Sequence, residues 1–179
     1  MSNPSATLSA IARTNWPRLK RFFRAKVLEP DCYDLTQDTL LAFVRSNPTQ
    51  IERPEAYLWT IARHKLIDYY KRKRPTEVFE STRLSIADVG GGLSTQLDRR
   101  RRLTAALHRL PIDQQIAFEL RFGEELALQE VAEVMQVSLA TVKRYLQRAR
   151  SSLREILSEP EFAAVGASEA AVVDAYRRE

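Results

Sequence analysis

Hydrophobic residues recur every three or four positions along most of the chain, and this spacing is typical of amphipathic helices. No segment alternates apolar and polar residues long enough to predict a strand. No proline falls between Pro111 and Pro160, so nothing in that stretch forces a helix to break. We therefore expect an all-α protein.

The clearest interruption of the periodic pattern is "SIADVGGGLSTQ" at residues 85–96, which holds three of the five glycines. A glycine run has no side chains to pack, which favours a flexible linker. A phosphate-binding loop is the less favoured alternative, because no Gly-Lys-Ser/Thr follows and no apolar strand precedes it. The expected organisation is two small helical domains joined by this linker: a first domain over 5–78, a linker over 79–96, a second domain over 97–158 and an unassigned tail over 159–179.

In the second domain, "PIDQQIAFELRF" predicts a helix with Pro111 in its first turn and its end at Gly123. The next helix, "ALQEVAEVM", places Leu128, Val131, Ala132 and Met135 on one face. The residues "QVS" then form a turn, with Ser138 as the N-cap of a third helix. Two helices joined by a three-residue turn predict a helix-turn-helix (winged-helix-like) domain.

The third helix of this domain separates apolar from basic residues. The expected buried stripe, at spacings of four and three, is Val142, Leu146, Ala149, Leu153 and Ile156. The opposite face holds Ala140, Arg144, Gln147 and Ser151, flanked by Lys143 and Arg148, with Arg150 and Arg154 further round. No acidic residue occurs on this helix before Glu155, whereas the preceding helices carry Glu119, Glu124, Glu125, Glu130 and Glu133.

The net charge of +5 and the pI near 9.6 favour a polyanionic partner. On the third helix, an exposed Arg can bind guanine bidentately, Gln can bind adenine, and the other cations suit phosphates. A solvated basic face is the alternative, but such faces usually mix signs. Gln136 stands where this turn favours glycine, at a cost of about 1 kcal/mol if φ is positive. DNA binding is the interpretation we prefer.

The first domain has two informative helices. "DLTQDTLLAFVRS" offers Leu40, Phe43 and Val44 to a core, and it clusters Asp34, Gln37, Asp38 and Thr39 near its start. "PEAYLWTIARHKLIDYYKRKR" begins a new helix at Pro54. Its expected core stripe is Leu58, Ile61, Ala62, Leu66 and Tyr69. Trp59 and Tyr70 lie beside Arg63 and are either core residues or platforms for stacking single-stranded DNA.

The order of these segments resembles the extracytoplasmic-function sigma factors of bacterial RNA polymerase, which keep two sigma domains. The resemblance covers about residues 5–158. It implies that "DLTQD" docks on the clamp helices of the polymerase β′ subunit, that the following loop and helix recognise and melt the −10 element, and that the helix-turn-helix binds the −35 element. The implied polymerase-binding residues are Asp34, Gln37, Asp38 and Leu41. The implied −10 residues are Asn47, Arg53, Trp59, Arg63, His64, Lys65, Lys71 and Arg72. The implied −35 residues are Ser138, Ala140, Thr141, Lys143, Arg144, Gln147 and Arg148.

The chain departs from the family pattern in three places. His64 stands where many members have Asn, Gln136 replaces the turn glycine, and "KRYLQRA" differs from the commoner basic-Ser-Arg pattern, so the −35 sequence does not carry over. "FELRF" and "TVKRYLQRA" look closer to the iron-siderophore sigma factors, which answer to a membrane anti-sigma protein. An anti-sigma factor, which in that subgroup is a membrane protein, is therefore an implied partner beside core polymerase and promoter DNA.

The remaining composition limits other functions. Cys32 is the one cysteine and there are two histidines, so neither an intramolecular disulfide nor a zinc site or other cofactor is expected. No apolar run approaches the ~20 residues of a membrane span, and the N-terminus lacks the order of a signal peptide, so the expected location is the cytoplasm. Carboxylates with no convergent spacing argue against a nucleic-acid enzyme.

Two other functions stay open from the sequence. A stand-alone helix-turn-helix regulator would bind duplex DNA without polymerase, and a helical adaptor would bind no polyanion. In the tail, Ser168 is a candidate cap for a short helix with Ala171, Val172, Ala175 and Tyr176 on one face, docked on the second domain or on a regulator.

Overall fold

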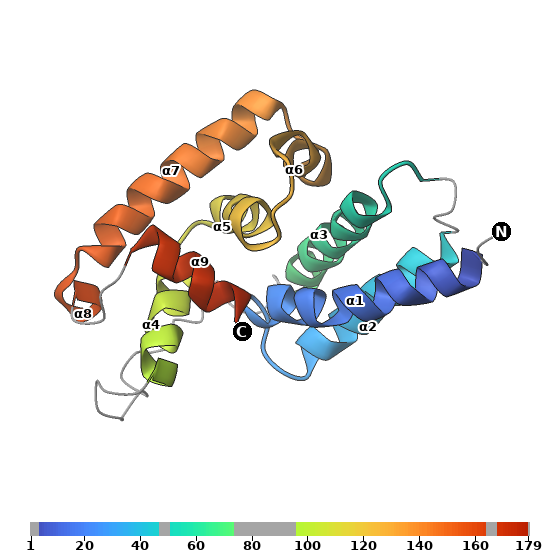
Figure 1. Cartoon of the computed structure of the whole chain (residues 1–179), viewed down its shortest axis with the longest axis horizontal. Helices are drawn as coiled ribbons and strands as arrows, with labels where there is room; N and C mark the ends of the chain where they lie inside the picture. The colour runs from blue at the N-terminus through green and yellow to red at the C-terminus, as the bar shows by residue number, and fades with distance from the viewer. Residues whose placement is uncertain (1–3, 47–50, 74–95, 164–167, 179) are drawn as a thin grey trace. The chain divides into compact units, whose positions relative to one another are not determined.

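The computed structural model describes residues 4–46, 51–73, 96–163 and 168–178, and this part of the chain contains helices and turns but no strand. The fold class is therefore all-α, as predicted (Figure 1). The helices belong to two compact units. The first contains the described residues up to Lys73 together with Ala132–Gln136, the end of helix α6 and the residue after it, and the second contains the other described residues from Gln96 onwards.

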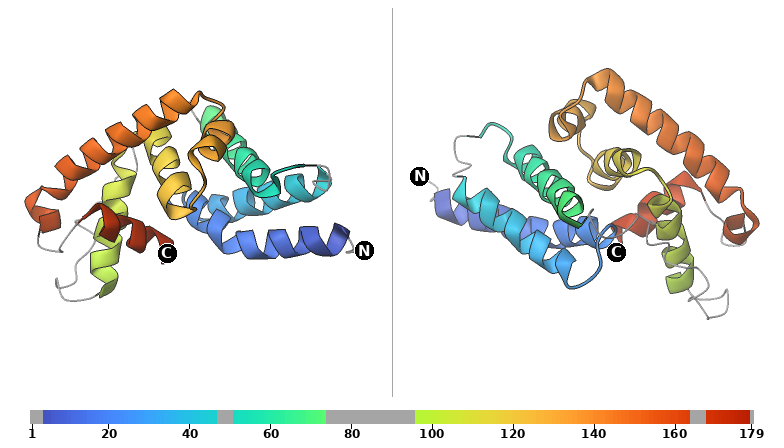
Figure 2. Two further views of the ribbon diagram at one scale, coloured as in Figure 1. Left: turned by 45° about the horizontal axis from the view of Figure 1, so that its top comes forward. Right: turned by 180° about the vertical axis from the view of Figure 1, so that it is seen from behind.

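The first unit contains α1 (Pro4–Arg24), α2 (Asp31–Arg45) and α3 (Pro54–Lys73). Helix α2 packs on both α1 and α3, and the view from behind in Figure 2 shows α1 and α2 running side by side. Large apolar side chains from all three helices are fully buried between them: Leu19, Phe22, Phe23, Phe43, Leu58, Trp59 and Leu66. These side chains make a single small core, which fixes the outward faces of α2 and α3.

One expectation for α2 is wrong: Val44 is 45% exposed instead of buried. Thr39, next to the exposed Asp38, is fully buried. The Thr39 hydroxyl donates to the carbonyl of Leu35, so its burial leaves no unmet hydrogen bond. Among the predicted core residues, Phe43 is buried and Leu40 is half-buried.

The second unit begins with α4 (Gln96–His108) and α5 (Ile112–Phe118), and α5 continues into a π-helical turn, η3 (Glu119–Gly123). Pro111 precedes α5 in an extended conformation, φ −54° and ψ 140°, instead of lying in its first turn. The unit continues with α6 (Leu128–Met135), α7 (Leu139–Leu157), α8 (Pro160–Ala163) and α9 (Glu169–Arg177). Helix α5 packs on α7, and α4 packs on α9.

The helix-turn-helix is formed by α6, the turn Gln136–Ser138 and α7. All five residues of the predicted stripe on α7, Val142, Leu146, Ala149, Leu153 and Ile156, are buried. The described residues include no strand, so the winged-helix likeness extends to the helices and not to a β wing. The predicted glycine linker at 79–96 lies outside the described residues, apart from Gln96 at the start of α4.

The tail forms a docked helix. Ser168 caps α9 through its Oγ, which accepts a hydrogen bond from the backbone N–H of Ala171 at 3.1 Å. Val172, Ala175 and Tyr176 are buried, as the sequence predicts for one face of this helix. Since α9 packs on α4 and η3, the tail docks on the second unit.

Candidate nucleic-acid and polymerase interfaces

The turn between α6 and α7 has the conformation that presents α7. Gln136 has φ of 55°, in the left-handed region, which is the strained conformation expected at this position. Ser138 has extended backbone, φ −69° and ψ 153°, and its Oγ accepts from the Thr141 N–H at 3.2 Å. This cap ends the turn and begins α7, and it confirms the predicted N-cap.

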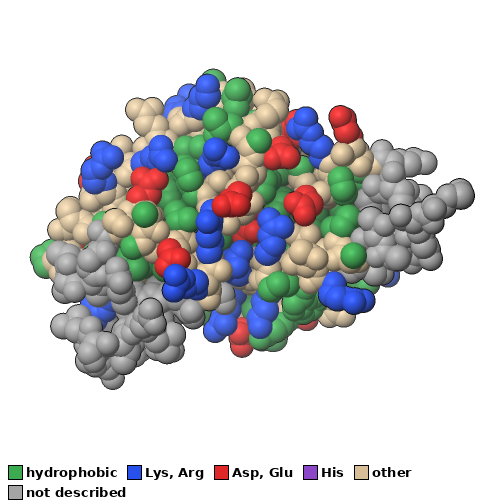
Figure 3. Space-filling view, in the orientation of Figure 1, with side chains coloured by type: hydrophobic (Ala, Val, Ile, Leu, Met, Phe, Trp, Pro, Cys, Tyr) green, Lys and Arg blue, Asp and Glu red, His purple; other side chains and the backbone are tan. Residues whose placement is uncertain are grey.

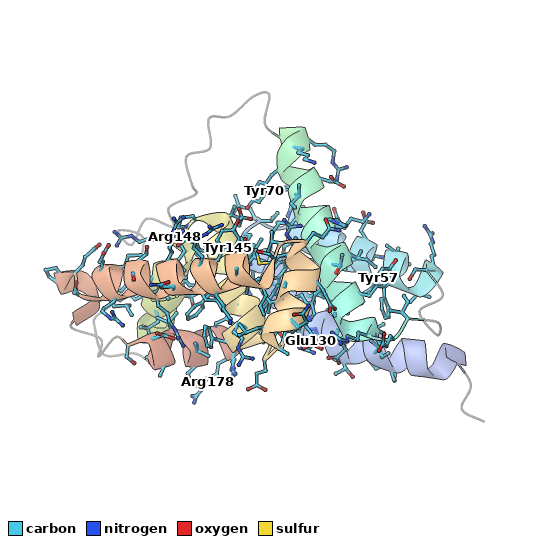
Figure 4. The ribbon with its side chains drawn as sticks, turned by 90° about the horizontal axis from the view of Figure 1, so that it is seen from above. Tyr57, Tyr70, Glu130, Tyr145, Arg148 and Arg178 are labelled. Carbon is cyan, nitrogen blue, oxygen red and sulfur yellow. The ribbon has the colours of Figure 1, made fainter. Side chains whose placement is uncertain are left out.

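The face of α7 opposite its buried stripe is exposed and basic. Ala140, Lys143, Arg144, Gln147, Arg148 and Ser151 are all exposed, as is Ser138, while Thr141 is half-buried. In Figure 3, Lys and Arg side chains predominate along the edge that α7 forms. Figure 4 shows Tyr145 and Arg148 on this helix from above. The residues of α7 that the sequence predicts to contact DNA therefore lie together on one face of this helix.

An open groove runs beside this face, with a volume of 460 Å³. It is lined by Gln114, Arg144, Gln147, Arg148, Ser151 and Ser152, and none of these is acidic. Gln114 comes from the first turns of α5 and was not among the predicted site residues. Its amide oxygen is buried without a hydrogen-bond partner among the described residues. The sequence gives no signal for it, because its place depends on the packing of α5 against α7.

A second exposed face lies on α2. Asp34, Gln37, Asp38 and Leu41 are exposed, and Leu41 keeps 45% of its surface in solvent. Their spacing of i, i+3, i+4 and i+7 places all four on one side of the helix. The Asp38 carboxylate lies 3.5 Å from Nζ of Lys65 on α3, so this face borders the helix assigned to the −10 element. An acidic and apolar stripe of this kind suits a protein partner with basic and apolar groups.

Helix α3 presents most of its predicted DNA-binding residues, but Trp59 is not among them. His64, Lys71 and Arg72 are exposed, as is Arg53 before the helix, while Arg63 and Lys65 are half-buried. Asn47 lies outside the described residues.

The stacking role for Trp59 is wrong, because its side chain is 1% exposed. Its indole ring packs edge-on against Phe22 at 5.4 Å between ring centroids, within the core of the first unit. A buried ring has no free face for a base. Tyr70 is half-buried, and its hydroxyl donates to the carbonyl of Lys26 at 2.7 Å.

Across residues 4–46, 51–73, 96–163 and 168–178, no group of three or more His, Cys, Asp and Glu side chains is placed to hold a metal ion. Over the same described ranges, no helix combines the length and the apolar character that crossing a bilayer requires. The Cys32 thiol is buried in the first unit, and this burial raises its pKa.

Two segments of the chain match two regions of one known protein family. Residues 11–76 match Sigma-70 region 2, and residues 100–153 match Sigma-70, region 4. The extracytoplasmic-function RNA polymerase sigma factor SigX of Bacillus subtilis is 29% identical over 132 residues, 68% of each chain. The chain belongs to the extracytoplasmic-function sigma factors. The predicted family is therefore confirmed.

Further relatives agree with this assignment. The ferric citrate uptake sigma factor FecI of Escherichia coli is 28% identical over 152 residues, 81% of this chain and 87% of that protein. A solved structure of the sigma factor RpoE from Bartonella quintana, in complex with the anti-sigma factor NepR, shares the fold with a TM-score of 0.63 and 23% identity. That match covers 85% of this chain and 97% of the other.

The family fixes the general activity. Sigma factors bind core RNA polymerase and direct it to promoter DNA, and they are non-enzymatic initiation factors. This sigma factor therefore has RNA polymerase and promoter DNA as its partners. A stand-alone regulator is not favoured, because such a protein has no need of the region that residues 11–76 match.

Proposed function

We propose that this sigma factor holds core polymerase through the exposed stripe on α2. The observation that carries this proposal is the common exposure of Asp34, Gln37, Asp38 and Leu41 on one helix face, where Leu41 keeps 45% of its surface in solvent. The sequence resemblance puts the clamp helices of the β′ subunit opposite this face. The acids supply charge for steering and register, and Leu41 supplies apolar area to bury.

Promoter contacts divide between the two domains, which we take as residues 5–78 and 97–158 with the linker 79–96 between them. Arg144 and Gln147 read base edges of the −35 element as duplex, and Lys143 and Arg148 bind phosphates, with Ser138, Ala140 and Thr141 at the approach to the groove. Arg53, Arg63, His64, Lys65, Lys71 and Arg72 hold opened −10 DNA together with Asn47. Trp59 supports this surface from the core.

In this proposal the protein has no catalytic site of its own, because polymerase performs the chemistry. The protein acts in the cytoplasm, together with polymerase. An anti-sigma factor is the expected regulator, which fits the solved relative that was crystallised with one. The likeness to the ferric citrate uptake sigma factor fits the iron-siderophore subgroup, whose anti-sigma protein lies in a membrane.

The promoter contacts are tested with holoenzyme reconstituted from core polymerase and this chain. Fragments of the source genome that this holoenzyme retains define the promoter. Arg144→Ala and Gln147→Ala should change the retained upstream sequences, because these side chains face base edges. Arg154→Ala is the matched control, since Arg154 is exposed on the same helix further from the turn. Unchanged sequence preference in the Arg144→Ala and Gln147→Ala variants would show that α7 does not recognise the −35 sequence.

A further inference from the structure

The C-terminal helix α9 is anchored on the second domain at three points. The Tyr176 ring lies against Gly123 at the end of η3, and its hydroxyl donates to the Glu124 carboxylate at 3.2 Å. The Arg177 guanidinium donates to the carbonyl of Phe122 at 2.6 Å and to the Glu125 carboxylate at 2.6 Å. These contacts hold the C-terminal end of α9 against the segment that leads into α6.

The third anchor joins the start of α9 to α7, the recognition helix of the helix-turn-helix. The Glu169 carboxylate accepts a hydrogen bond from Nε of Arg150, on α7, at 2.8 Å. The Arg150 guanidinium also lies over the ring of Phe122, 4.7 Å from its centroid. Arg150 is thus held between an acid of the tail and an aromatic ring of η3.

This contact sets Arg150 apart from the other cations of the recognition helix. Lys143, Arg144 and Arg148 are exposed and have no ion pair with an acid among the residues that the structure describes. Arg150 belongs to the same acid-free basic stretch, but Glu169 neutralises it. The recognition helix therefore presents one cation fewer than its sequence provides.

We propose that α9 withholds Arg150 from DNA, so that the tail lowers the affinity of the second domain for the phosphate backbone of duplex DNA. This inference rests on the proposed function, in which α7 binds the −35 duplex. The Arg150–Glu169 pair is about half-exposed, with 49% and 36% of the two side chains in solvent, so it is weak and easily exchanged for a phosphate. Release of α9 converts Arg150 into a phosphate contact beside Lys143.

The test measures binding of the full-length protein to a labelled duplex of random sequence, by fluorescence anisotropy, over a range of salt concentrations. Glu169→Gln should tighten binding. One added phosphate contact steepens the slope of log affinity against log salt by about 0.9. The affinity advantage over wild type should therefore grow about 3.5-fold for a fourfold dilution of salt. Asp174→Asn is the matched control, because it removes the same charge from α9, where Asp174 pairs at 3.0 Å with Arg178, the C-cap residue of this helix.

A double-variant experiment decides whether the gain in DNA affinity arises from the Arg150–Glu169 contact. In an Arg150→Gln background, Glu169→Gln should leave both the affinity and the salt slope unchanged. A gain that persists without Arg150, or one that Asp174→Asn reproduces in full, would show a general charge effect and overturn the inference. Circular dichroism of each variant, unchanged from wild type, confirms that the helices are intact.

The two proposals fail in different ways. If the wild-type protein binds duplex DNA and Glu169→Gln changes nothing, the role of α9 is wrong and the proposed function stands. If neither the wild type nor polymerase holoenzyme engages duplex DNA through α7, the proposed function falls, and the inference falls with it.

Discussion

The ring of Tyr176 in α9 lies in the space that a Cβ atom on residue 123 would occupy. Gly123 ends the π-helical turn η3, and Tyr176 is 1% exposed. Gly123, which the sequence predicts as the end of a helix, therefore also forms the contact site for α9. The docking of α9 depends on this missing side chain as well as on its polar anchors.

Gly123→Ala should destabilise the second domain by about 1–3 kcal/mol, because the buried Tyr176 ring has no room to move aside. Urea denaturation followed by circular dichroism measures this change. In a Tyr176→Ala background the same substitution should cost much less, since the space is then empty. Equal costs in both backgrounds would mean that α9 does not dock at Gly123.

Gln136→Gly should stabilise the second domain. Gln136 has φ of 55°, a conformation that costs a non-glycine residue on the order of 1 kcal/mol and glycine almost nothing. The gain in the free energy of unfolding should be about 0.5–1 kcal/mol after the extra freedom of glycine in the unfolded chain is subtracted. Gln136→Val, which tolerates positive φ poorly, should destabilise. A loss of stability in Gln136→Gly would contradict the turn described here.

The two tryptophans should differ in their access to solvent. Trp59 is 1% exposed and Trp16 is 38% exposed. Acrylamide should therefore quench the fluorescence of a Trp16→Phe protein, which retains Trp59, far less than that of a Trp59→Phe protein. Addition of single-stranded DNA should leave Trp59 emission unchanged, because its ring has no face for stacking. Strong quenching of Trp59 by acrylamide or DNA would restore the stacking role.

The Arg109–Glu159 pair predicts a pH dependence. Two hydrogen bonds of 2.7 Å from the Arg109 guanidinium lower the pKa of the Glu159 carboxyl below its ordinary value. A lowered pKa in the folded state stabilises the fold above the ordinary pKa, and this contribution is lost as pH falls through the lowered one. Glu159→Gln should therefore reduce Tm at pH 7. The difference from wild type should vanish in acid, and a difference that grows in acid would refute the pair.

The sequence predicted the recognition helix well because its features are local. The Oγ of Ser138 caps α7 by accepting a hydrogen bond from the N–H of Thr141, only three residues ahead. The buried stripe from Val142 to Ile156 follows from helical spacing alone. Trp59 and Val44 were misplaced because helical periodicity defines a face but not its width. Trp59 enters the core because α1 supplies Phe22 against it, and Val44 stays exposed because no described helix covers it. Contacts such as Arg150 with Glu169 depend on the return of the tail, which no local pattern encodes.

The central claim is that the α2 face holds core polymerase, and affinity for purified core polymerase tests it directly. Asp34→Ala with Gln37→Ala is the sharpest variant, because it spares the Asp38–Lys65 pair and so leaves the −10 surface unchanged. Adding Asp38→Ala to this variant should give the largest loss of affinity for core polymerase. The paired control replaces Lys71 and Arg72, exposed on α3, with Ala. Tight binding by the wild type and the control, with at least tenfold weakening in the α2 variants, equivalent to about 1.4 kcal/mol, is the predicted result. Equal binding by the wild type and all α2 variants would contradict it.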